Sequence, residues 1–240
     1  MPLEERLKHF ADLGVDCTIV VPFTRRFARR SAETFVLEIL TRRLAATAVL
    51  VGENFAFGAH RHGDIATLKA LGSAHGMRVI PLTSMRWHGQ PISSSRIRHL
   101  IAHGDLGHAR RLLGRAPELY GTVVHGAGRG RRLGVPTANL RLIPQVLPPR
   151  GVYAVLVRQS QGRRTWQGVM NLGVRPTFGP GPLTCEVHLL KYSGTLLGRR
   201  VAVSLLAPLR RERRFATAQS LVRQIQRDLA HARRIFTRLR

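Results

Sequence analysis

Cysteine, lysine and acidic residues are all scarce in this chain of 240 residues. The 2 cysteines, Cys17 and Cys185, lie far apart, each inside an apolar run. This favours buried free thiols in a reducing cytoplasm over a disulfide framework or a metal site. Apolar residues reach 44% and the mean hydropathy is -0.07, as in globular proteins, and no apolar run has the length of a membrane span. Residues 1–10 contain acids and lack the apolar core of a secretory signal. We therefore expect a folded cytoplasmic protein with no membrane partner.

Charge of one sign dominates the composition. The chain has 39 lysine and arginine residues against 13 acidic ones, a formal net charge of +26. Only Lys8, Lys69 and Lys191 are lysines, so arginine supplies nearly all of this charge. Such a balance is typical of proteins that bind nucleic acid, anionic lipid or polyphosphate. The arginines are spread along the chain, however, and few aromatic residues are available for base stacking. A genome-wide arginine bias explains the charge at least as well, and nucleic acid is not the expected partner.

The first half of the chain alternates predicted helices and strands. Helices are expected over residues 4–13, from Ser31 onward, and over 64–71, 94–102 and 106–113, and strands over 16–21, 47–52 and 77–82. Ser31 is a suitable N-cap residue. The strands are near-continuous apolar runs, which is typical of a parallel sheet covered on both faces. This half therefore predicts an α/β layer.

The pattern of predicted secondary structure changes after residues 114–117, Gly-Arg-Ala-Pro. We therefore place a boundary there between domains 1–116 and 117–240. Short strands separated by Gly and Pro are expected over residues 120–124, 151–157, 166–172, 183–190 and 200–206. This spacing predicts a small antiparallel β-barrel. A final helix is expected over 217–236, where the apolar residues are spaced by four, four, three and four and form one stripe.

The most specialised stretch is residues 126–140, GAGRGRRLGVPTANL. Its glycines and one of its three arginines are candidate ligand-binding residues: Gly126, Gly128, Gly130, Gly134 and Arg132. Glycine permits positive φ and lets backbone N–H groups approach a ligand closely, as a phosphate cradle requires. A Gly-rich turn alone could equally be a solvated hairpin.

The residues after this turn could hold a metal ion. Because Val135 precedes Pro136, helical φ/ψ angles are disfavoured at Val135, and the chain should become extended. An extended chain presents Thr137 and Asn139 on the same side. A hydroxyl and an amide oxygen suit Mg²⁺, which prefers oxygen ligands and accompanies substrate phosphates. The sequence therefore predicts a site for a magnesium nucleotide.

Carboxylates are few in residues 121–240, where Glu186, Glu212 and Asp228 are the only ones. Phosphoryl transfer to a hydroxyl needs a group that takes the proton. Asp228 belongs to the final helix, and Glu212 lies among arginines, where an ion-paired surface role is expected. The period of two in Thr-Cys-Glu-Val-His-Leu puts Glu186 on the face opposite the apolar residues. A lone acid there suits a catalytic base and an exposed partner of arginine equally. Arg210 likewise could meet substrate or solvent.

The run Gly-Arg-x-Leu-Gly-x-Pro-Thr-Ala-Asn-Leu at residues 130–140 resembles the ATP-binding signature of riboflavin kinases. The resemblance continues through residues 151–155 (GVYAV), 169–178 (VMNLGVRPTF), 186–189 (EVHL), 209–215 (LRRERRF) and 228–233 (DLAHAR). Upstream, residues 51–58 (VGENFAFG) and 92–98 (ISSSRIR) resemble the FMN adenylyltransferase domain of the bacterial bifunctional riboflavin kinase/FAD synthetases. The two halves also follow that family's order, so the chain resembles a member truncated at its N-terminus.

The resemblance implies that the second domain phosphorylates riboflavin to FMN with Mg-ATP. The base in that family is the glutamate of the Glu-Val-His motif, which is Glu186 here. The family also places Asn171 and residues 175–178 near the flavin, and we expect a role for Arg210 on the substrate side. Riboflavin and ATP are the expected substrates, and Mg²⁺ at Thr137 and Asn139 is the expected metal.

The adenylyltransferases of this type hold the ATP phosphates with a His-x-Gly-His turn after their first strand, and this chain has no such turn. Asn54, Ser94 and Arg98 remain as candidates, because the first lies in the Gly-Glu-Asn-Phe turn and the others begin a helix whose N–H groups could hold an anion. We therefore expect residues 1–116 to be a Rossmann-like nucleotidyltransferase remnant. FMN adenylylation, which the family implies, lacks its histidines here, and self-association could cover the missing strand.

A competing hypothesis, from another functional class, is a basic nucleic-acid-binding or scaffold module on an inactive enzyme fold. That hypothesis predicts polyanion binding that falls steeply with salt. Flavin turnover that is insensitive to added DNA would support the kinase instead.

Overall fold

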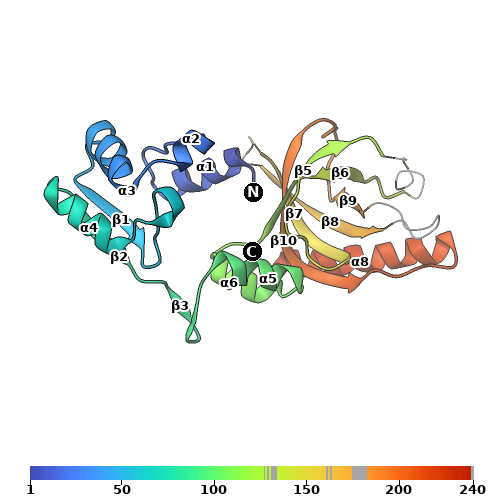
Figure 1. Ribbon diagram of the computed structural model, residues 1–240. Coiled ribbons are helices and arrows are strands. Elements are labelled where there is room, and N and C mark those ends of the chain that lie inside the picture. The colour runs from blue at the N-terminus through green and yellow to red at the C-terminus, as the bar shows by residue number, and fades with distance from the viewer. Residues whose placement is uncertain are drawn as a thin grey trace. The chain divides into compact units, whose positions relative to one another are not determined.

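A computed structural model of the chain describes residues 1–126, 128, 130, 134–160, 162, 164–174 and 183–238. Its contacts form two compact units (Figure 1). Met1–Gly14 and Ser93–Arg240 make up the barrel unit, and Val15–Ile92 makes up the α/β unit.

The described strands of the barrel unit close into a barrel in the order β10-β5-β6-β9-β8-β7, with antiparallel pairing throughout. They are β5 (Glu118–Val124), β6 (Ala138–Leu142), β7 (Gly151–Gln159), β8 (Thr165–Val174), β9 (Leu183–Leu189) and β10 (Arg200–Arg211). The predicted barrel is confirmed. Strand β6 is an addition, because only an extended segment was expected there. In β9 the side chains of Cys185 and Val187 join the barrel core, so Glu186 between them faces outward.

Helix α8 (Ala218–Arg238) packs along the outside of the barrel (Figure 1). Its apolar stripe is confirmed, since Leu229, Ala232 and Phe236 are buried. Ala232 and Phe236 form a small cluster with Ala154 of β7. The helix also buries Asp228, which is 5% exposed.

Three further helices belong to the barrel unit: α1 (Leu3–Asp12), α5 (Ser94–Ala102) and α6 (Leu106–Leu113). Each was predicted within a residue or so. The side chain of Asp105 caps α6 by accepting from the backbone N–H of His108, and Gly114 ends the helix with a φ of 69°. The compact units therefore divide the chain differently from the predicted domains 1–116 and 117–240. The boundary between residues 116 and 117, which was inferred from the change in predicted secondary structure, stays a prediction.

The α/β unit has a small parallel sheet. Its elements are α2 (Arg25–Ala28), α3 (Ala32–Thr34), the π-helix η1 (Phe35–Arg43), β1 (Ala48–Gly52), the 3₁₀-helix η2 (Ala59–Arg61), α4 (Ile65–Ala74), β2 (Arg78–Leu82), β3 (Arg86–Trp87) and β4 (Gln90–Pro91). Strands β1 and β2 pair in parallel, and β3 and β4 form an antiparallel pair. Ser31 caps α3 as predicted, because its Oγ accepts from the N–H of Thr34 at 3.1 Å. Val36, Phe57 and Leu68 lie in the core of this unit.

Two predictions for this unit are wrong. Residues 16–21 form no strand, and Ile19 and Val20 are more than half exposed. A strand needs a neighbour to pair its N–H and C=O groups, and the described residues offer none to this segment. Cys17 is consequently exposed, whereas Cys185 is buried as predicted. The sheet is also covered less than expected, since Leu50 of β1 is 59% exposed.

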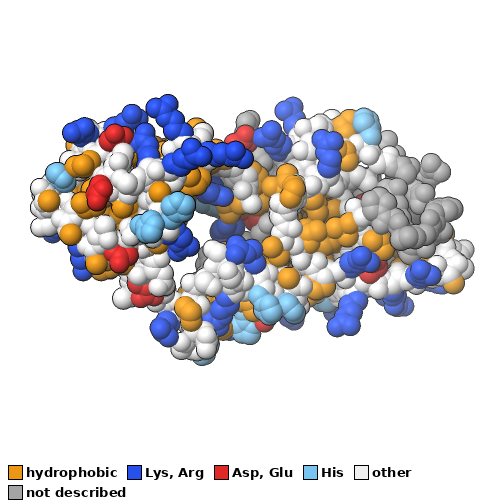
Figure 2. Space-filling model, in the orientation of Figure 1, with side chains coloured by type: hydrophobic (Ala, Val, Ile, Leu, Met, Phe, Trp, Pro, Cys, Tyr) orange, Lys and Arg blue, Asp and Glu red, His pale blue; other side chains and the backbone are white. Residues whose placement is uncertain are grey.

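Basic side chains are distributed over both units on the face seen in Figure 2, as the spread of arginine in the sequence predicted. Within the described parts of the chain, no helix is both long and apolar enough to cross a membrane.

Candidate active site

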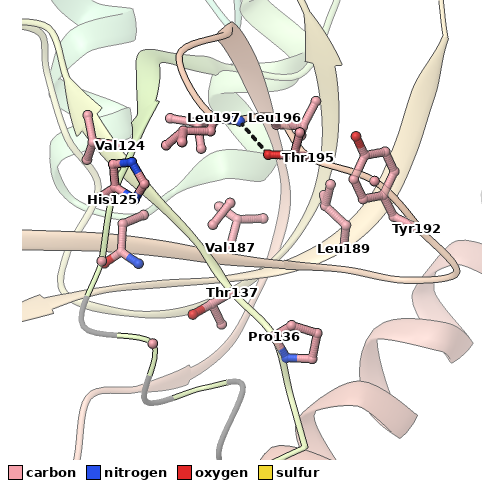
Figure 3. Close-up of a pocket in the computed structure, with 16 residues that line it drawn as sticks. Val124, His125, Pro136, Thr137, Val187, Leu189, Tyr192, Thr195, Leu196 and Leu197 are labelled. Carbon is pink, nitrogen blue, oxygen red and sulfur yellow. Dashed lines mark hydrogen bonds between the residues drawn. The ribbon is translucent and has the colours of Figure 1, made fainter.

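Two cavities of similar size adjoin in the barrel unit. The first has a volume of about 640 Å³ and the second about 660 Å³. They share Gly128, Thr137 and Asn139 as lining residues. The first cavity is mostly apolar, with Leu189 and Tyr192 on one side (Figure 3). The predicted oxygen pair therefore stands at the border of two spaces large enough for separate substrates.

A row of polar side chains crosses the outer face of the barrel in the second cavity. Glu186 of β9 is the register partner of Asn139 on β6 and of Asn171 on β8. Residues directly opposite one another in a sheet share a face, so the two amides flank the carboxylate. The Thr137 hydroxyl also reaches this group, since its Oγ1 donates to Glu186 Oε2 at 3.3 Å. The structure thus brings together the base and both metal candidates predicted from the sequence.

The Gly-rich segment lies directly against the oxygen pair. A Cβ at Gly126 would overlap the Asn139 amide, and one at Gly130 would lie 2.5 Å from the Val135 carbonyl and 2.9 Å from Thr137 Oγ1. The N–H of Val135 donates to the Gly130 carbonyl at 2.8 Å and closes the turn. A side chain at either glycine would displace the backbone from the site. The predicted Arg132 lies outside the described residues.

Pro136, another predicted site residue, is held by a side chain from β9. The Nδ1 atom of His188 lies 2.7 Å from the Pro136 carbonyl. A carbonyl oxygen only accepts hydrogen bonds, so the imidazole must carry a proton on Nδ1. This bond ties the segment before Thr137 to the strand that carries Glu186.

The oxygens at the border of the cavities fit a hard divalent cation. Thr137 and Asn139 supply a hydroxyl and an amide oxygen, which suit Mg²⁺, and the Glu186 carboxylate lies beside them. The described residues contain no group of three or more His, Cys, Asp or Glu side chains that could hold a metal. A cation at this position would therefore depend on these neutral oxygens, water and substrate phosphates, because Mg²⁺ usually keeps several waters and binds phosphates in nucleotide sites.

An ion pair closes the opposite end of the second cavity. The Nε atom of Arg210 lies 2.9 Å from Asp228 Oδ2 and 3.2 Å from Oδ1. Both residues line this cavity, as does Glu212, whose carboxylate packs against the backbone of Gly173. Glu212 is therefore half-buried, not a simple surface residue. Sequence reasoning set Asp228 aside as part of the final helix, although its spacing of seven residues from Leu221 and three from Ile225 puts it on the apolar stripe.

None of the candidates of the first half is a lining residue of either cavity. Asn54 is exposed in the turn after β1, in the α/β unit. Ser94 is the first residue of α5, but the residue that caps this helix is Ser93. Arg98 donates to Ser95 Oγ at 3.2 Å. Asn54, Ser94 and Arg98 stay predictions for a nucleotide site.

Comparisons with known proteins agree with this geometry. Residues 113–236 match the family model described as riboflavin kinase, and residues 1–96 match the one described as FAD synthetase. The barrel with its adjoining cavities is thus that of a flavokinase.

Named relatives extend the match to the whole chain. The bifunctional riboflavin kinase/FMN adenylyltransferase of Escherichia coli (strain K12) is 40% identical over 234 residues, which cover 98% of this chain and 74% of that protein. The Haemophilus influenzae protein of the same name is 37% identical over 236 residues, with 98% and 76% covered. A Streptococcus pneumoniae crystal structure titled as a macrolide-efflux protein has a TM-score of 0.83 and 29% identity, and covers 97% of this chain and 75% of that one. The chain belongs to the bifunctional riboflavin kinase/FMN adenylyltransferase family. It is an enzyme of flavin biosynthesis whose family uses ATP and riboflavin.

Proposed function

We propose that Glu186 is the base that removes the proton from the terminal ribityl hydroxyl of riboflavin. One observation carries this proposal: the Glu186 carboxylate lies between the amides of Asn139 and Asn171, at the border of the two cavities. Glu186 lines the second cavity and not the first. The acceptor hydroxyl therefore approaches from the second cavity.

ATP then occupies the first cavity, with its phosphates toward the border. Gly126 and Gly128 line this cavity, and glycine backbone N–H groups suit phosphate oxygens. The apolar side chains of Leu189 and Leu197 suit the adenine ring. Thr137 and Asn139 would hold Mg²⁺, which when bound neutralises phosphate charge.

Riboflavin occupies the second cavity, where its ring system meets apolar residues. Phe215 and two residues of α8, Leu221 and Ile225, line this space. Burial of aromatic surface against such side chains provides the affinity. Asn171 lies on this side of Glu186, in keeping with a role near the flavin.

The reaction follows from these positions. The ribityl oxygen attacks the γ-phosphorus of ATP, the bond from that phosphorus to the bridging oxygen breaks, and ADP leaves. The proton of the hydroxyl passes to a Glu186 oxygen. The Thr137 hydroxyl donates to Glu186 Oε2 at 3.3 Å and keeps the carboxylate oriented. Because ATP supplies the phosphoryl group, we place the enzyme in the cytoplasm.

For residues 1–96, which match the family model described as FAD synthetase, we propose that the candidates Asn54, Ser94 and Arg98 do not by themselves support the conversion of FMN to FAD. Supplying FMN, ATP and Mg²⁺ to the purified chain and measuring FAD and pyrophosphate tests this. Appreciable FAD would show that Asn54, Ser94 and Arg98 suffice.

The kinase proposal is tested with riboflavin, ATP and Mg²⁺ by measuring FMN. Glu186→Gln keeps size and hydrogen bonding but removes proton acceptance, so FMN formation should fall about 10²- to 10⁴-fold. Asp12→Asn, an exposed change on α1, serves as the control. Near-normal turnover in Glu186→Gln would refute the base assignment. Chelation of Mg²⁺ should abolish turnover, and added DNA should leave it unchanged.

A further inference from the structure

The row of side chains that contains Glu186 extends further across the barrel. Asn171 is the register partner of Val152 on β7, and Val152 is the partner of Arg210 on β10. All of these residues line the second cavity. Measured along the curved sheet, Arg210 lies three strands from Glu186, which at about 4.8 Å per strand is about 14 Å. This separation is comparable to the length of riboflavin from its terminal hydroxyl to the far edge of its ring.

Arg210 is fixed on several sides by its surroundings. Its Nε atom donates to both carboxylate oxygens of Asp228, and its Nη1 atom donates to the Arg211 carbonyl at 3.2 Å. The guanidinium also lies over the Phe215 ring, 5.5 Å from its centroid. Among the described residues no hydrogen bond occupies Nη2, so this atom keeps its donors for a ligand.

Asp228 is itself held in a single orientation. Its side chain is 7% exposed, and that of Arg210 is 18% exposed. Gln224, one turn earlier on α8, donates to Asp228 Oδ1 at 2.7 Å. A buried ion pair is weak evidence for stability because desolvation offsets much of the attraction. The pair does, however, fix the direction of a planar donor group at the wall of the cavity.

The chemistry of the ring system identifies what this donor could bind. Riboflavin has one polar edge, the pyrimidinedione ring with two carbonyl oxygens, and one apolar edge of dimethylbenzene. A guanidinium group only donates hydrogen bonds, so it suits the carbonyl edge. A phosphate clamp would need Arg210 beside the transferred group, but Arg210 lies about 14 Å along the sheet from Glu186. Its charge is also matched by Asp228, which suits an uncharged ligand.

We propose that Asp228 is a positioning residue that holds the Arg210 guanidinium toward the second cavity, where it donates a hydrogen bond to a pyrimidinedione carbonyl of riboflavin. This inference rests on the proposed function, because Glu186 at the ribityl hydroxyl sets the direction of the ring. Arg210 thereby determines which flavin edge faces β10.

The test compares riboflavin with 2-thioriboflavin and 4-thioriboflavin, in which sulfur replaces one carbonyl oxygen and accepts hydrogen bonds poorly. The wild-type chain should use one of the two analogues with a KM about tenfold above that for riboflavin, the ratio expected for one hydrogen bond. Asp228→Asn should raise the KM for riboflavin by a similar factor and leave the KM for that analogue and for ATP nearly unchanged. The preference for riboflavin should therefore disappear.

A matched control is Glu118→Gln. Glu118 is another largely buried acid of the barrel unit, where it accepts from Tyr120 Oη at 2.7 Å and Ser204 Oγ at 3.1 Å, and it lines neither cavity. This variant should lose stability and keep the preference for riboflavin. Arg210→Lys keeps the charge and loses the planar fork, so it should lose the preference. If Asp228→Asn fails to fold, the loss of preference is measured on Arg210→Lys instead.

The outcomes separate this inference from the proposed base. If Asp228→Asn keeps the wild-type ratio of KM values, Asp228 has a structural role only and the inference is wrong. Equal use of riboflavin and both analogues by the wild type would overturn it as well. If Glu186→Gln retains turnover while the preference still depends on Asp228, the base assignment fails and the positioning role stands.

Discussion

Asn139 and Glu186 are direct register partners on β6 and β9, and the backbone of Gly126 lies against the Asn139 amide. Asn171 stands on the other side of the same carboxylate, on β8. The two asparagines differ in one respect: Asn139 lines both cavities, whereas Asn171 lines only the second. Because both are register partners of Glu186, on opposite sides of it, they make a matched pair for separating the two substrates.

Asn139→Ala should raise the KM for Mg-ATP about tenfold, the effect of one lost hydrogen bond or ligand contact, and leave riboflavin binding nearly intact. Asn171→Ala should do the reverse, raising the KM for riboflavin by a similar factor. Steady-state kinetics measure the first quantity, and quenching of flavin fluorescence without nucleotide measures riboflavin affinity. An equal loss of flavin affinity in Asn139→Ala would move that residue into the flavin site.

The two cysteines should differ sharply in reactivity toward an alkylating reagent. Burial, together with the neighbouring Glu186 charge, raises the pKa of Cys185 to about 12, and the thiolate is the reactive form. Cys17 is exposed. In the folded protein the label should therefore appear on Cys17, and on Cys185 only after denaturation, as peptide mass spectrometry can show. Labelling of both at one rate in native buffer would contradict the barrel packing around Cys185.

Local signals predicted the helices better than the strands. Helices α5 and α6 were predicted to the residue, because Asp105 and Gly114 mark the ends of α6 and the apolar positions repeat between them. Residues 16–21 carry the apolar, β-branched composition of a strand, but composition cannot supply a pairing partner. Strand β6 was missed for the opposite reason: it is short and becomes a strand through its pairing with β5 and β9.

For the candidate site too, local sequence signals predicted some residues, whereas tertiary packing brings the others together. Thr137 and Asn139 were predicted because both lie in one extended segment. That they lie beside Glu186 could not be predicted in this way, because it depends on the pairing of β6 with β9 in the barrel. The Arg210 and Asp228 pair joins residues that the sequence separates by a strand end and a loop. No periodicity links the two positions, so only the packing of α8 on the barrel reveals the pair. The division into two cavities has no signal in the sequence either.

The cap of α6 should make the stability of the barrel unit depend on pH. Hydrogen bonds from the His108 side chain and backbone N–H lower the pKa of Asp105. A carboxyl group whose pKa is lowered on folding stabilises the native state above its ordinary pKa of about 4, and this stabilisation is lost as the pH falls through the folded value.

Asp105→Ala should therefore destabilise the unit by about 1 kcal/mol at neutral pH, and the gap from wild type should shrink under acid. Urea unfolding at several pH values measures the gap. A difference that stayed constant down to strongly acidic pH would mean that the Asp105 charge contributes nothing.

The buried ion pair of helix α1 should anchor it to the barrel more strongly than its exposed ion pair does. Glu5 is 2% exposed and its Oε2 atom lies 2.7 Å from Arg158 Nη2, whereas the neighbouring Glu4 pairs with Arg200 at 2.8 Å with both side chains more than half exposed. Removing one partner of a buried pair leaves an uncompensated charge and costs about 3–5 kcal/mol. An exposed pair is worth about 0–1 kcal/mol.

Glu5→Ala should therefore lower the free energy of unfolding far more than Glu4→Ala does. Trp166 lies in β8 and Trp87 in the α/β unit, so a Trp87→Phe background makes tryptophan fluorescence report on the barrel unit. In that background, Glu5→Ala combined with Arg158→Ala should cost much less than the sum of the single changes, because each removes the same interaction. If Glu5→Ala costs no more than Glu4→Ala, α1 does not depend on this pair for its place on the barrel.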